Sequence, residues 1–341
     1  MKVQSLYFIA PRQVTVLEEP LPPLLPDQLL IQTLLSAISP GTELLVYRGE
    51  FPRNVPVDET IDALAGEFSY PLKYGYSTVG RVSAAGAAAD PAWLGRTVFA
   101  FQPHASHFAA APADLIPVPQ DLPVEEAVFL PNMETAVNFL MDGAPLIGEQ
   151  VAVLGQGIVG LLTTALLAEF PLASLVTLDR WPLRRQASLS LGASASLDPG
   201  SPGAIVQARA ALGGSHPEAG ADLVYELSGS PTALDLALEL AGFDSRIVIG
   251  SWYGDKRASM DLGGRFHRSR IRLVSSQVSS LAPAHGGRWD KPRRLQVAWE
   301  MLRKIKPSRF ITHRFPVGQA GEAYRLLDED PAEAIQVVFT Y

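Results

Sequence analysis

The stretch VAVLGQGIVG, residues 151–160, decides how the chain is expected to fold. Its apolar start is typical of a buried strand, and the residues after it have the composition of a helix. Gly155 would allow a tight turn, Gly157 would let a pyrophosphate approach the backbone, and Gly160 would let the helix pack closely on the strand. The N–H groups at the helix start, which would face the phosphates, are those of Ile158, Val159 and Gly160. The stretch therefore predicts a dinucleotide-binding strand–loop–helix unit.

Asp179 supports this prediction and indicates which dinucleotide binds. It ends the next strand pattern, SLVTLD, 24 residues after Gly155. A carboxylate at this place can accept hydrogen bonds from the adenosine ribose hydroxyls and repels a 2′-phosphate. Arg180 and Arg184 follow directly, and an arginine beside the ribose can hold a 2′-phosphate. We therefore expect NAD to be preferred, and NADP stays open as the alternative.

The chain changes character near residue 123. Before it, short alternating runs with strand character are interrupted by segments such as PLPPLLPDQ and SPGTE. The segment PVEEAVFLPNMETAVNFLMDGA then has helical spacing, and regular alternation of strands and helices follows, which implies a parallel sheet covered on both faces. We expect an α/β protein with two domains. A β-rich domain would span 1–122 and be completed by about 281–341, and a doubly wound Rossmann domain would span 123–280.

Composition excludes several function classes. The chain has 341 residues and no cysteine, so disulfides, thiolate catalysis and Cys-ligated zinc are excluded. The N-terminal stretch lacks the apolar core of a signal peptide, and no apolar run reaches the ~20 residues that cross a bilayer. The net charge is −7, and the basic zone Arg246–Arg309 holds no nucleic-acid motif. We expect a cytoplasmic protein that binds neither membranes nor nucleic acids.

Several segments together carry a resemblance that covers nearly the whole chain. SPGTELLVYRGEFP (39–52) is similar to a C-G-T-D-x-H-x-x-x-G segment, and YGYSTVGRV (74–82) to G-H-E-x-x-G-x-V. With the glycine loop and the closing ITHRFP, EAYRLLDED and VVFTY, the chain resembles the medium-chain dehydrogenase/reductase superfamily, in its zinc-type alcohol dehydrogenase-like form. The resemblance implies a GroES-like catalytic domain, a Rossmann domain, a nicotinamide cofactor, a small-molecule substrate, and a homodimer or homotetramer.

The same resemblance shows where the catalytic zinc ligands of the family would fall, and no plausible zinc ligand stands there. The positions of the first Cys, the His, the neighbouring Glu and the second Cys fall on Pro40 (or Ser39), Tyr76, Ser77 and near Pro131. The family's proton relay keeps its hydroxyl at Thr42 but has Leu45 in place of the relay His. We therefore expect a zinc-independent member.

Without zinc, another group must stabilise the substrate oxygen and exchange a proton. Tyr76 is the first candidate, because its phenol can donate to a carbonyl oxygen; the alternative is that its ring only fills the vacated space. Lys73 could lower the pKa of this phenol if it folds back. Thr42 is a candidate hydrogen-bond donor, and His104, in FAFQPHASHF, is a candidate acid/base group.

Other residues carry expectations from their positions. Thr135 and Ser251 are expected beside the nicotinamide, with Trp252 and Tyr253 lining the cofactor or substrate pocket. Glu134 is considered as a general base, although a carboxylate at a helix start is also an electrostatic fit. The resemblance gives Glu43 a structural role, bonded to an arginine. Gly75, Gly80 and Val82 predict a strand–turn–strand element.

Three functions remain open from the sequence. The first is an NAD-dependent oxidoreductase that acts without zinc on an alcohol or ketone, of a bulky or anionic kind. The second is an NADPH-dependent quinone or enoyl reductase that reduces a C=C bond, against which Asp179 counts. The third is a nucleotide-binding subunit that has lost catalysis and serves redox sensing, because every metal ligand and the relay His are replaced.

Overall fold

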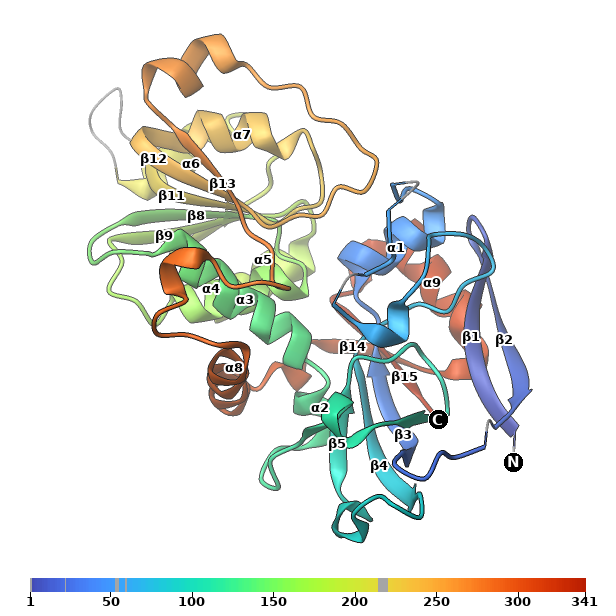
Figure 1. Ribbon diagram of the computed structural model, residues 1–341. Coiled ribbons are helices and arrows are strands. Elements are labelled where there is room, and N and C mark those ends of the chain that lie inside the picture. Colours follow the sequence, from blue (N-terminus) through green and yellow to red (C-terminus); the bar gives the residue numbers. More distant parts are fainter. Residues whose placement is uncertain (1, 22, 53–54, 59, 214–219) are drawn as a thin grey trace. The chain divides into compact units, whose positions relative to one another are not determined.

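The computed structural model describes residues 2–21, 23–52, 55–58, 60–213 and 220–341. The chain falls into two compact units, which are shown in Figure 1. The first unit comprises Met1–Pro131 and Leu302–Tyr341, and the second comprises Asn132–Met301. The boundaries expected from the sequence, after 122 and near 280, lie earlier in the chain than these two.

The second unit is built on a parallel sheet of six strands, in the order β10-β9-β8-β11-β12-β13. The strands are β8 (Gln150–Leu154), β9 (Ser174–Leu178), β10 (Ala195–Leu197), β11 (Ala221–Glu226), β12 (Ala241–Ile249) and β13 (Arg272–Ser275). The helices are α4 (Ile158–Leu167), α5 (Pro182–Ser190), α6 (Ala204–Leu212) and α7 (Ala233–Leu240), while α3 (Leu130–Gly143) and α8 (Lys291–Ile305) cross the unit boundaries. This strand order is that of the doubly wound dinucleotide-binding fold.

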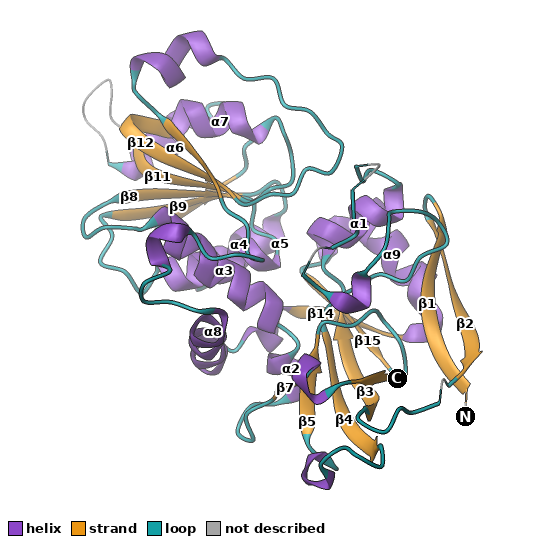
Figure 2. Ribbon diagram, in the orientation of Figure 1, coloured by secondary structure: helices purple, strands orange, loops and turns teal. Residues whose placement is uncertain are grey.

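Both faces of this sheet are buried, as the continuous apolar strand patterns predict. Alternate residues of β8 point to opposite faces, so Val151 and Val153 pack with residues of α3 and α4. Ala152 and Leu154 pack with residues of α6 and α7 on the other side. Figures 1 and 2 show these two helix layers on either side of the strands. The predicted parallel sheet with two covered faces is confirmed.

The first unit contains a seven-stranded sheet in the order β14-β15-β3-β4-β5-β7, with β6 paired to β3, and a separate β1–β2 hairpin. The strands are β1 (Lys2–Ala10), β2 (Gln13–Pro20), β3 (Leu29–Ala37), β4 (Thr78–Ala85), β5 (Thr97–Ala100), β6 (His107–Ala110), β7 (Ile116–Pro117), β14 (Ile311–Pro316) and β15 (Gln336–Thr340). The helices are α1 (Pro40–Arg48), α2 (Val124–Ala127) and α9 (Ala320–Glu329). Its core joins β1, α1, α9 and β15 through residues such as Phe8, Val46, Tyr324 and Phe339.

The predicted strand–turn–strand element at 75–82 is wrong, because Gly80 lies inside the continuous strand β4. A Cβ on Gly80 would lie 2.4 Å from Ile31 Cγ2 and 2.6 Å from the Gln32 carbonyl oxygen on β3. The glycine therefore serves the close approach of two paired strands and not a turn. In a single sequence the two uses of glycine look alike.

The segment SPGTE, predicted as an interruption between strands, begins helix α1. Proline is accepted in the first turn of a helix because the N–H group that it lacks has no helical partner there. Ser39 is the N-cap residue, and the Glu43 carboxylate accepts the backbone N–H of Ser39 at 2.7 Å. The helix ends at Arg48, and its C-cap residue Gly49 has a left-handed φ of 76°.

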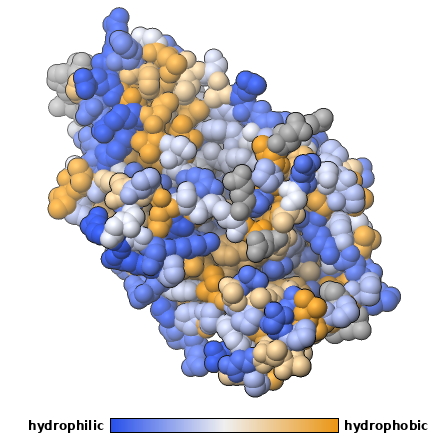
Figure 3. Space-filling model, viewed as in Figure 1, coloured by the Kyte–Doolittle hydropathy of each residue, from blue (hydrophilic) through white to orange (hydrophobic). Residues whose placement is uncertain are grey.

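The helical pattern expected from residue 123 is also divided, since α2 ends at Ala127 and α3 begins at Leu130. Among the described residues, no helix combines the length and the apolar character that a membrane crossing requires. On the face seen in Figure 3, hydrophilic side chains are interspersed with hydrophobic ones.

Candidate active site

The three glycines of the loop after β8 have the three geometries that the sequence predicts for them. Gly155 has φ of +91°, a left-handed conformation suited to the turn. A Cβ on Gly160 would lie 2.0 Å from the Gly155 carbonyl oxygen, so only glycine allows α4 to start this close to the loop. A Cβ on Gly157 would meet no heavy atom within 4 Å. The backbone at Gly157 therefore faces open space, and Gly157 caps α4 without a side chain.

Asp179 is part of the same loop structure. The residue is 7% exposed, and its carboxylate accepts the backbone N–H of Gln156 at 2.7 Å and that of Trp181 at 2.8 Å. The buried Gln156 side chain in turn donates to the Gly155 carbonyl oxygen at 3.1 Å and accepts from Thr164 at 2.9 Å. Asp179 therefore holds the glycine loop in place, and the two backbone hydrogen bonds fix the orientation of its carboxylate.

The arginines after Asp179 have different surroundings. Arg180 is exposed, and its guanidinium lies 5.9 Å from the centre of the Trp181 ring. Burial lowers the pKa of Arg184, while the Asp179 charge acts in the opposite direction. Arg185 donates to the carbonyl oxygen of Asp179 at 2.8 Å and pairs with Asp198. Of these three arginines, Arg184 thus interacts with the Asp179 charge, while Arg185 contacts only the backbone carbonyl of Asp179.

A buried glutamate, Glu226, joins the loops that follow β11 and β12, and sequence reasoning missed it. Its carboxylate accepts from the backbone N–H of Ser228 at 2.8 Å and from the hydroxyl of Tyr253. The Ser251 hydroxyl accepts the backbone N–H of Gly229 at 2.9 Å. Ser251 and Tyr253 therefore tie two loops together at the carboxyl edge of the sheet, where ligands bind in this fold. The signal in the sequence was a charge at the end of the strand ADLVYE, directly after the apolar run LVY.

Glu134 is held in a buried ion pair, which does not support its assignment as a general base. Arg294 is 1% exposed and donates to the Glu134 carboxylate at 2.8 and 3.1 Å. It also donates to Asn138 at 2.6 Å. Removing one partner of a buried pair of this kind costs about 3–5 kcal/mol. Thr135, next to Glu134 on α3, is half-buried.

In the first unit, Tyr76, Ser39 and Thr42 form a cluster of hydroxyls. The Tyr76 hydroxyl lies 2.5 Å from Ser39 Oγ and 3.1 Å from Thr42 Oγ1. Ser39 and Thr42 stand at the first turn of α1, and Tyr76 precedes β4. The structure thus joins residues that stand at three functional positions of the resemblance: the first Cys in its alternative alignment, the His and the relay hydroxyl. We call these three residues the hydroxyl cluster.

Tyr76 is a phenol that keeps its proton. Burial raises the pKa of Tyr76 above its ordinary value of 10.0, and its bonds to Ser39 and Thr42 only partly offset this. Lys73 does not fold back to it, which corrects the sequence expectation, because its ammonium group lies 2.6 Å from the Glu19 carboxylate. Its ammonium also lies over the Tyr7 ring.

His104 has no exposed side-chain surface, so it does not stand where it could touch a substrate directly. Its Nε2 lies 3.0 Å from Glu43 Oε2, and its Nδ1 lies 2.7 Å from Ser36 Oγ. Glu43 is bonded to this histidine and to the Tyr324 hydroxyl. The arginine that the resemblance implied as its partner is therefore replaced by a histidine and a tyrosine. His107, three residues further on, is half-buried.

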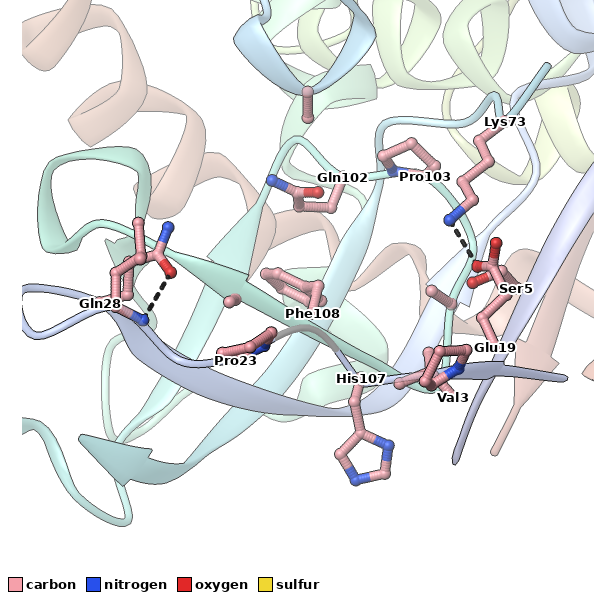
Figure 4. A pocket seen from close by; sticks show the side chains of 15 residues that line it. Val3, Ser5, Glu19, Pro23, Gln28, Lys73, Gln102, Pro103, His107 and Phe108 are labelled. Carbon is pink, nitrogen blue, oxygen red and sulfur yellow. Dashed lines mark hydrogen bonds and ion pairs between the residues drawn. The ribbon is translucent and has the colours of Figure 1, made fainter. Parts of the chain in front are cut away.

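A cavity of about 570 Å³ lies in the first unit between the β1–β2 hairpin, the loop before β3 and strand β6. Figure 4 shows Lys73 reaching Glu19 on its wall, together with Gln102 and His107. The residues of the hydroxyl cluster do not line it. Lys73 and His107 therefore line this cavity and not the hydroxyl cluster.

The donor groups at the positions implied for zinc do not suit that ion. Structural and catalytic zinc sites use Cys, His and carboxylate ligands. Here the corresponding side chains are the ring of Pro40 (or the hydroxyl of Ser39), the hydroxyls of Tyr76 and Ser77 and, near the second Cys position, the ring of Pro131. Ser77 donates to the Val128 carbonyl oxygen. Among the described residues, no group of three or more His, Cys, Asp or Glu side chains gathers as a metal site.

Comparison with known proteins agrees with the fold. No protein-family profile matches the chain. It is 29% identical over 66% of its length, and 60% of that protein, to the uncharacterized zinc-type alcohol dehydrogenase-like protein YphC of Escherichia coli. It is 22% identical to D-guloside 3-dehydrogenase of E. coli over 99% of this chain and 100% of that protein. Unlike D-guloside 3-dehydrogenase, the first relatives are matched over less than two thirds of their own length.

Solved structures give the same fold over whole chains. The alcohol dehydrogenase rspB of E. coli CFT073, solved with NADH, superposes with a TM-score of 0.79 at 18% identity, over 100% of this chain and 99% of that one. A dehydrogenase of Sinorhizobium meliloti solved with NADP gives a TM-score of 0.78 at 18% identity, over 100% of both chains. At this identity the superposition establishes the fold alone.

The fold is therefore that of the two-domain dehydrogenases, with a GroES-like β-rich domain and a Rossmann domain. The relatives and structural neighbours are zinc-type alcohol dehydrogenase-like members of the medium-chain dehydrogenase/reductase superfamily. The resemblance seen in the sequence is thus confirmed for the fold and for the kind of relative.

Proposed function

We propose that the protein is a nicotinamide-dependent dehydrogenase that interconverts an alcohol and its ketone without a catalytic zinc ion. The glycine loop is the observation that supports a nicotinamide cofactor. In this loop Gly155 is left-handed, Gly157 faces open space and Gly160 packs tightly. The open position is where a pyrophosphate must approach the backbone. The relatives named for oxidation of polyols and sugars support the alcohol or ketone as substrate.

The second unit supplies the groups that hold the cofactor. The pyrophosphate would meet the N–H groups at the start of α4, namely those of Ile158, Val159 and Gly160. Asp179 would take the adenosine ribose, with Arg180 and Arg184 beside it, and Thr135 and Ser251 are proposed on the nicotinamide side. When bound, this cofactor donates or accepts the hydride.

The hydroxyl cluster supplies the proton. In ketone reduction, the Tyr76 phenol would donate its proton to the substrate oxygen while the carbonyl carbon receives a hydride. Ser39 and Thr42 lie within hydrogen-bonding distance of Tyr76, so their hydroxyls can turn to stabilise the phenolate that remains. In alcohol oxidation the same groups would accept the proton. This arrangement would perform the task that a metal ion and a relay histidine perform in the family that the chain resembles.

The substrate class is proposed from the relatives' names alone. They include a galactitol 1-phosphate dehydrogenase, a sorbitol dehydrogenase and a D-guloside dehydrogenase. We propose a polyhydroxylated alcohol or its ketone, including bulky or phosphorylated ones. Product analysis separates this from reduction of a C=C bond, and complete lack of turnover with tight NADH binding would favour a nucleotide-binding subunit instead.

Assembly rests on the resemblance. We propose a homodimer or a homotetramer, as the resemblance implies, and we keep the cytoplasmic location that the sequence leads us to expect. Light scattering of the purified protein decides between these states.

Metal analysis tests the zinc-independent part of the proposal. We expect the purified protein to contain zinc far below one ion per chain, because hydroxyls stand where zinc would need thiolate, imidazole or carboxylate donors. Dialysis against a strong chelator is expected to leave turnover unchanged, measured as NADH consumption with a polyol-derived ketone. Stoichiometric zinc whose removal abolishes turnover would contradict the proposal.

The cofactor preference is tested at Asp179. In Asp179→Ala we expect NADH affinity to fall ~10-fold, since hydrogen bonds to a charged group are worth about 1.5–3 kcal/mol and tenfold corresponds to about 1.4 kcal/mol. NADPH affinity should fall less, because the charge that repels a 2′-phosphate is lost. Asp198→Ala is the control, since this carboxylate pairs with Arg185 on the same part of the unit. An unchanged ratio of NADH to NADPH affinity would refute the ribose assignment.

A further inference from the structure

Glu43 and His104 form a buried pair to which the proposed function gives no task. Both side chains have no exposed surface, and their atoms Oε2 and Nε2 are 3.0 Å apart. Burying two ionisable groups is unfavourable unless each is fully hydrogen-bonded. Their partners therefore show what the pair does.

The Glu43 carboxylate has three partners. Oε2 receives the hydroxyl of Tyr324 as well as His104, and Oε1 receives the backbone N–H of Ser39 at 2.7 Å. An ionised carboxylate only accepts hydrogen bonds. The proton between Glu43 and His104 then lies on Nε2 of the histidine.

The other side of the imidazole is fixed equally well. Nδ1 lies 2.7 Å from Ser36 Oγ, which lies 2.7 Å from the hydroxyl of Tyr341. The ring packs edge to face on Phe339, with centroids 5.0 Å apart. A Cβ on Gly75 would lie 2.7 Å from the His104 ring. The glycine that directly precedes Tyr76 therefore leaves the space that the imidazole occupies.

The pair reaches the hydroxyl cluster through helix α1. Ser39, the N-cap residue, donates its backbone N–H to Glu43, and its Oγ accepts the hydrogen bond of the Tyr76 hydroxyl. Thr42, the other partner of Tyr76, lies in the same helical turn. The Glu43 charge also raises the pKa of Tyr76, after the larger effect of burial. Glu43 is thus linked to Tyr76 both by position and by charge.

We propose that Glu43 and His104 are positioning residues for the hydroxyl cluster: His104 Nε2–H and Tyr324 hold one oxygen of Glu43, so that the other oxygen fixes Ser39 beneath the Tyr76 phenol. This inference rests on the proposed role of Tyr76 as the proton donor. It gives His104 an indirect role, and it replaces the arginine partner of Glu43 by a histidine of fixed tautomer.

The tautomer is the first test, and it needs no turnover. In protein labelled with ¹⁵N-histidine, the His104 signals, assigned by their loss in His104→Gln, are expected to show a protonated Nε2. In Glu43→Gln, the amide oxygen can keep the Ser39 N–H only by turning its NH₂ group toward His104. The neutral ring should then switch to the Nδ1–H form. A neutral Nδ1–H tautomer in the wild type would overturn the proposal even if the variant does not fold.

The second test follows Tyr76 itself. With ¹³C-labelled tyrosine, Glu43→Gln is expected to move the Tyr76 titration to lower pH, because a negative charge that opposes the phenolate is gone. Turnover should fall ~10- to 100-fold through kcat, as expected for a displaced reacting group, with KM for the cofactor unchanged. Glu19→Gln is the matched control, since Glu19 binds Lys73 and Tyr7 in the same unit, and it should change neither signal nor turnover.

The outcomes separate the two levels of the proposal. If Tyr76→Phe keeps full turnover, the proposed proton donor is wrong, but the histidine and tyrosine signals still decide whether Glu43 and His104 position the cluster. If Glu43→Gln leaves both the His104 tautomer and the Tyr76 titration as in the wild type, the positioning role is refuted, whatever its effect on turnover.

Discussion

Gly157→Val is expected to abolish NADH binding and to leave the protein folded. The backbone of Gly157 has φ of −66° and ψ of −178°, a conformation open to any residue, and an added Cβ meets no heavy atom within 4 Å. The valine side chain therefore fits the protein but occupies the space that a pyrophosphate needs. Losing two hydrogen bonds to a charged group, at about 1.5–3 kcal/mol each, weakens affinity ~100-fold or more. Calorimetric titration with NADH measures this loss, and thermal unfolding checks the fold.

Gly160→Ala provides the opposite result as a control. Its Cβ would lie 2.0 Å from the Gly155 carbonyl oxygen, so the helix must shift, and we expect a loss of stability of about 1–3 kcal/mol or more. Substitution of Gly157 thus affects binding without folding, whereas substitution of Gly160 affects folding as well. NADH binding by Gly157→Val at wild-type affinity would mean that the loop does not hold the cofactor.

The parts of the fold that the sequence predicts are those that local patterns determine. The glycine loop, the strand β8 and the helix α4 follow from neighbouring residues, and the structure has them as expected. The start of α1 was missed, because Pro40 and Gly41 are typical of turns. The structure adds a contact that the local sequence does not show, since Glu43 in this helix lies beside His104, 61 residues away in the chain.

The same distinction applies to the candidate site. Tyr76 and Thr42 were identified from their positions in a motif, and the structure brings them together with Ser39. Lys73 does not reach Tyr76, and Glu134 is not supported as a general base, because each side chain pairs with a residue of opposite charge, Glu19 and Arg294. A single sequence shows which residues carry charge but not which charges become paired on folding.

Tyr76→Phe is expected to lower kcat ~100-fold or more, since a positioned acid or base contributes 10²–10⁴ to the rate. The phenyl ring keeps the shape and the packing against Tyr74, whose ring centre lies 6.3 Å away. Only the hydroxyl shared with Ser39 and Thr42 is lost. The affinity for NADH should stay unchanged, because the residues proposed to hold the cofactor belong to the second unit. Steady-state and single-turnover rates of ketone reduction measure the effect.

The pH dependence of the rate of ketone reduction tests the same role of Tyr76. Burial raises the pKa of Tyr76 above 10.0, so the phenol carries its proton at neutral and mildly alkaline pH. The decline in the wild-type rate of ketone reduction that comes from Tyr76 ionisation should therefore lie at higher pH than for an ordinary tyrosine, whose pKa is 10.0. The residual rate of Tyr76→Phe should lack this decline, provided that both proteins remain folded.

Tyr7→Phe is the matched control for the missing hydroxyl. Tyr7 also lies in the first unit, and its hydroxyl donates to the side chain of Glu19. This hydrogen bond does not involve the hydroxyl cluster. It should retain wild-type kcat. If Tyr76→Phe turned over as fast as Tyr7→Phe, Tyr76 would only fill the space that a metal occupies in relatives of the zinc type. The proton would then have to come from another group, and Ser39 and Thr42, which lie beside it, would be the next residues to change.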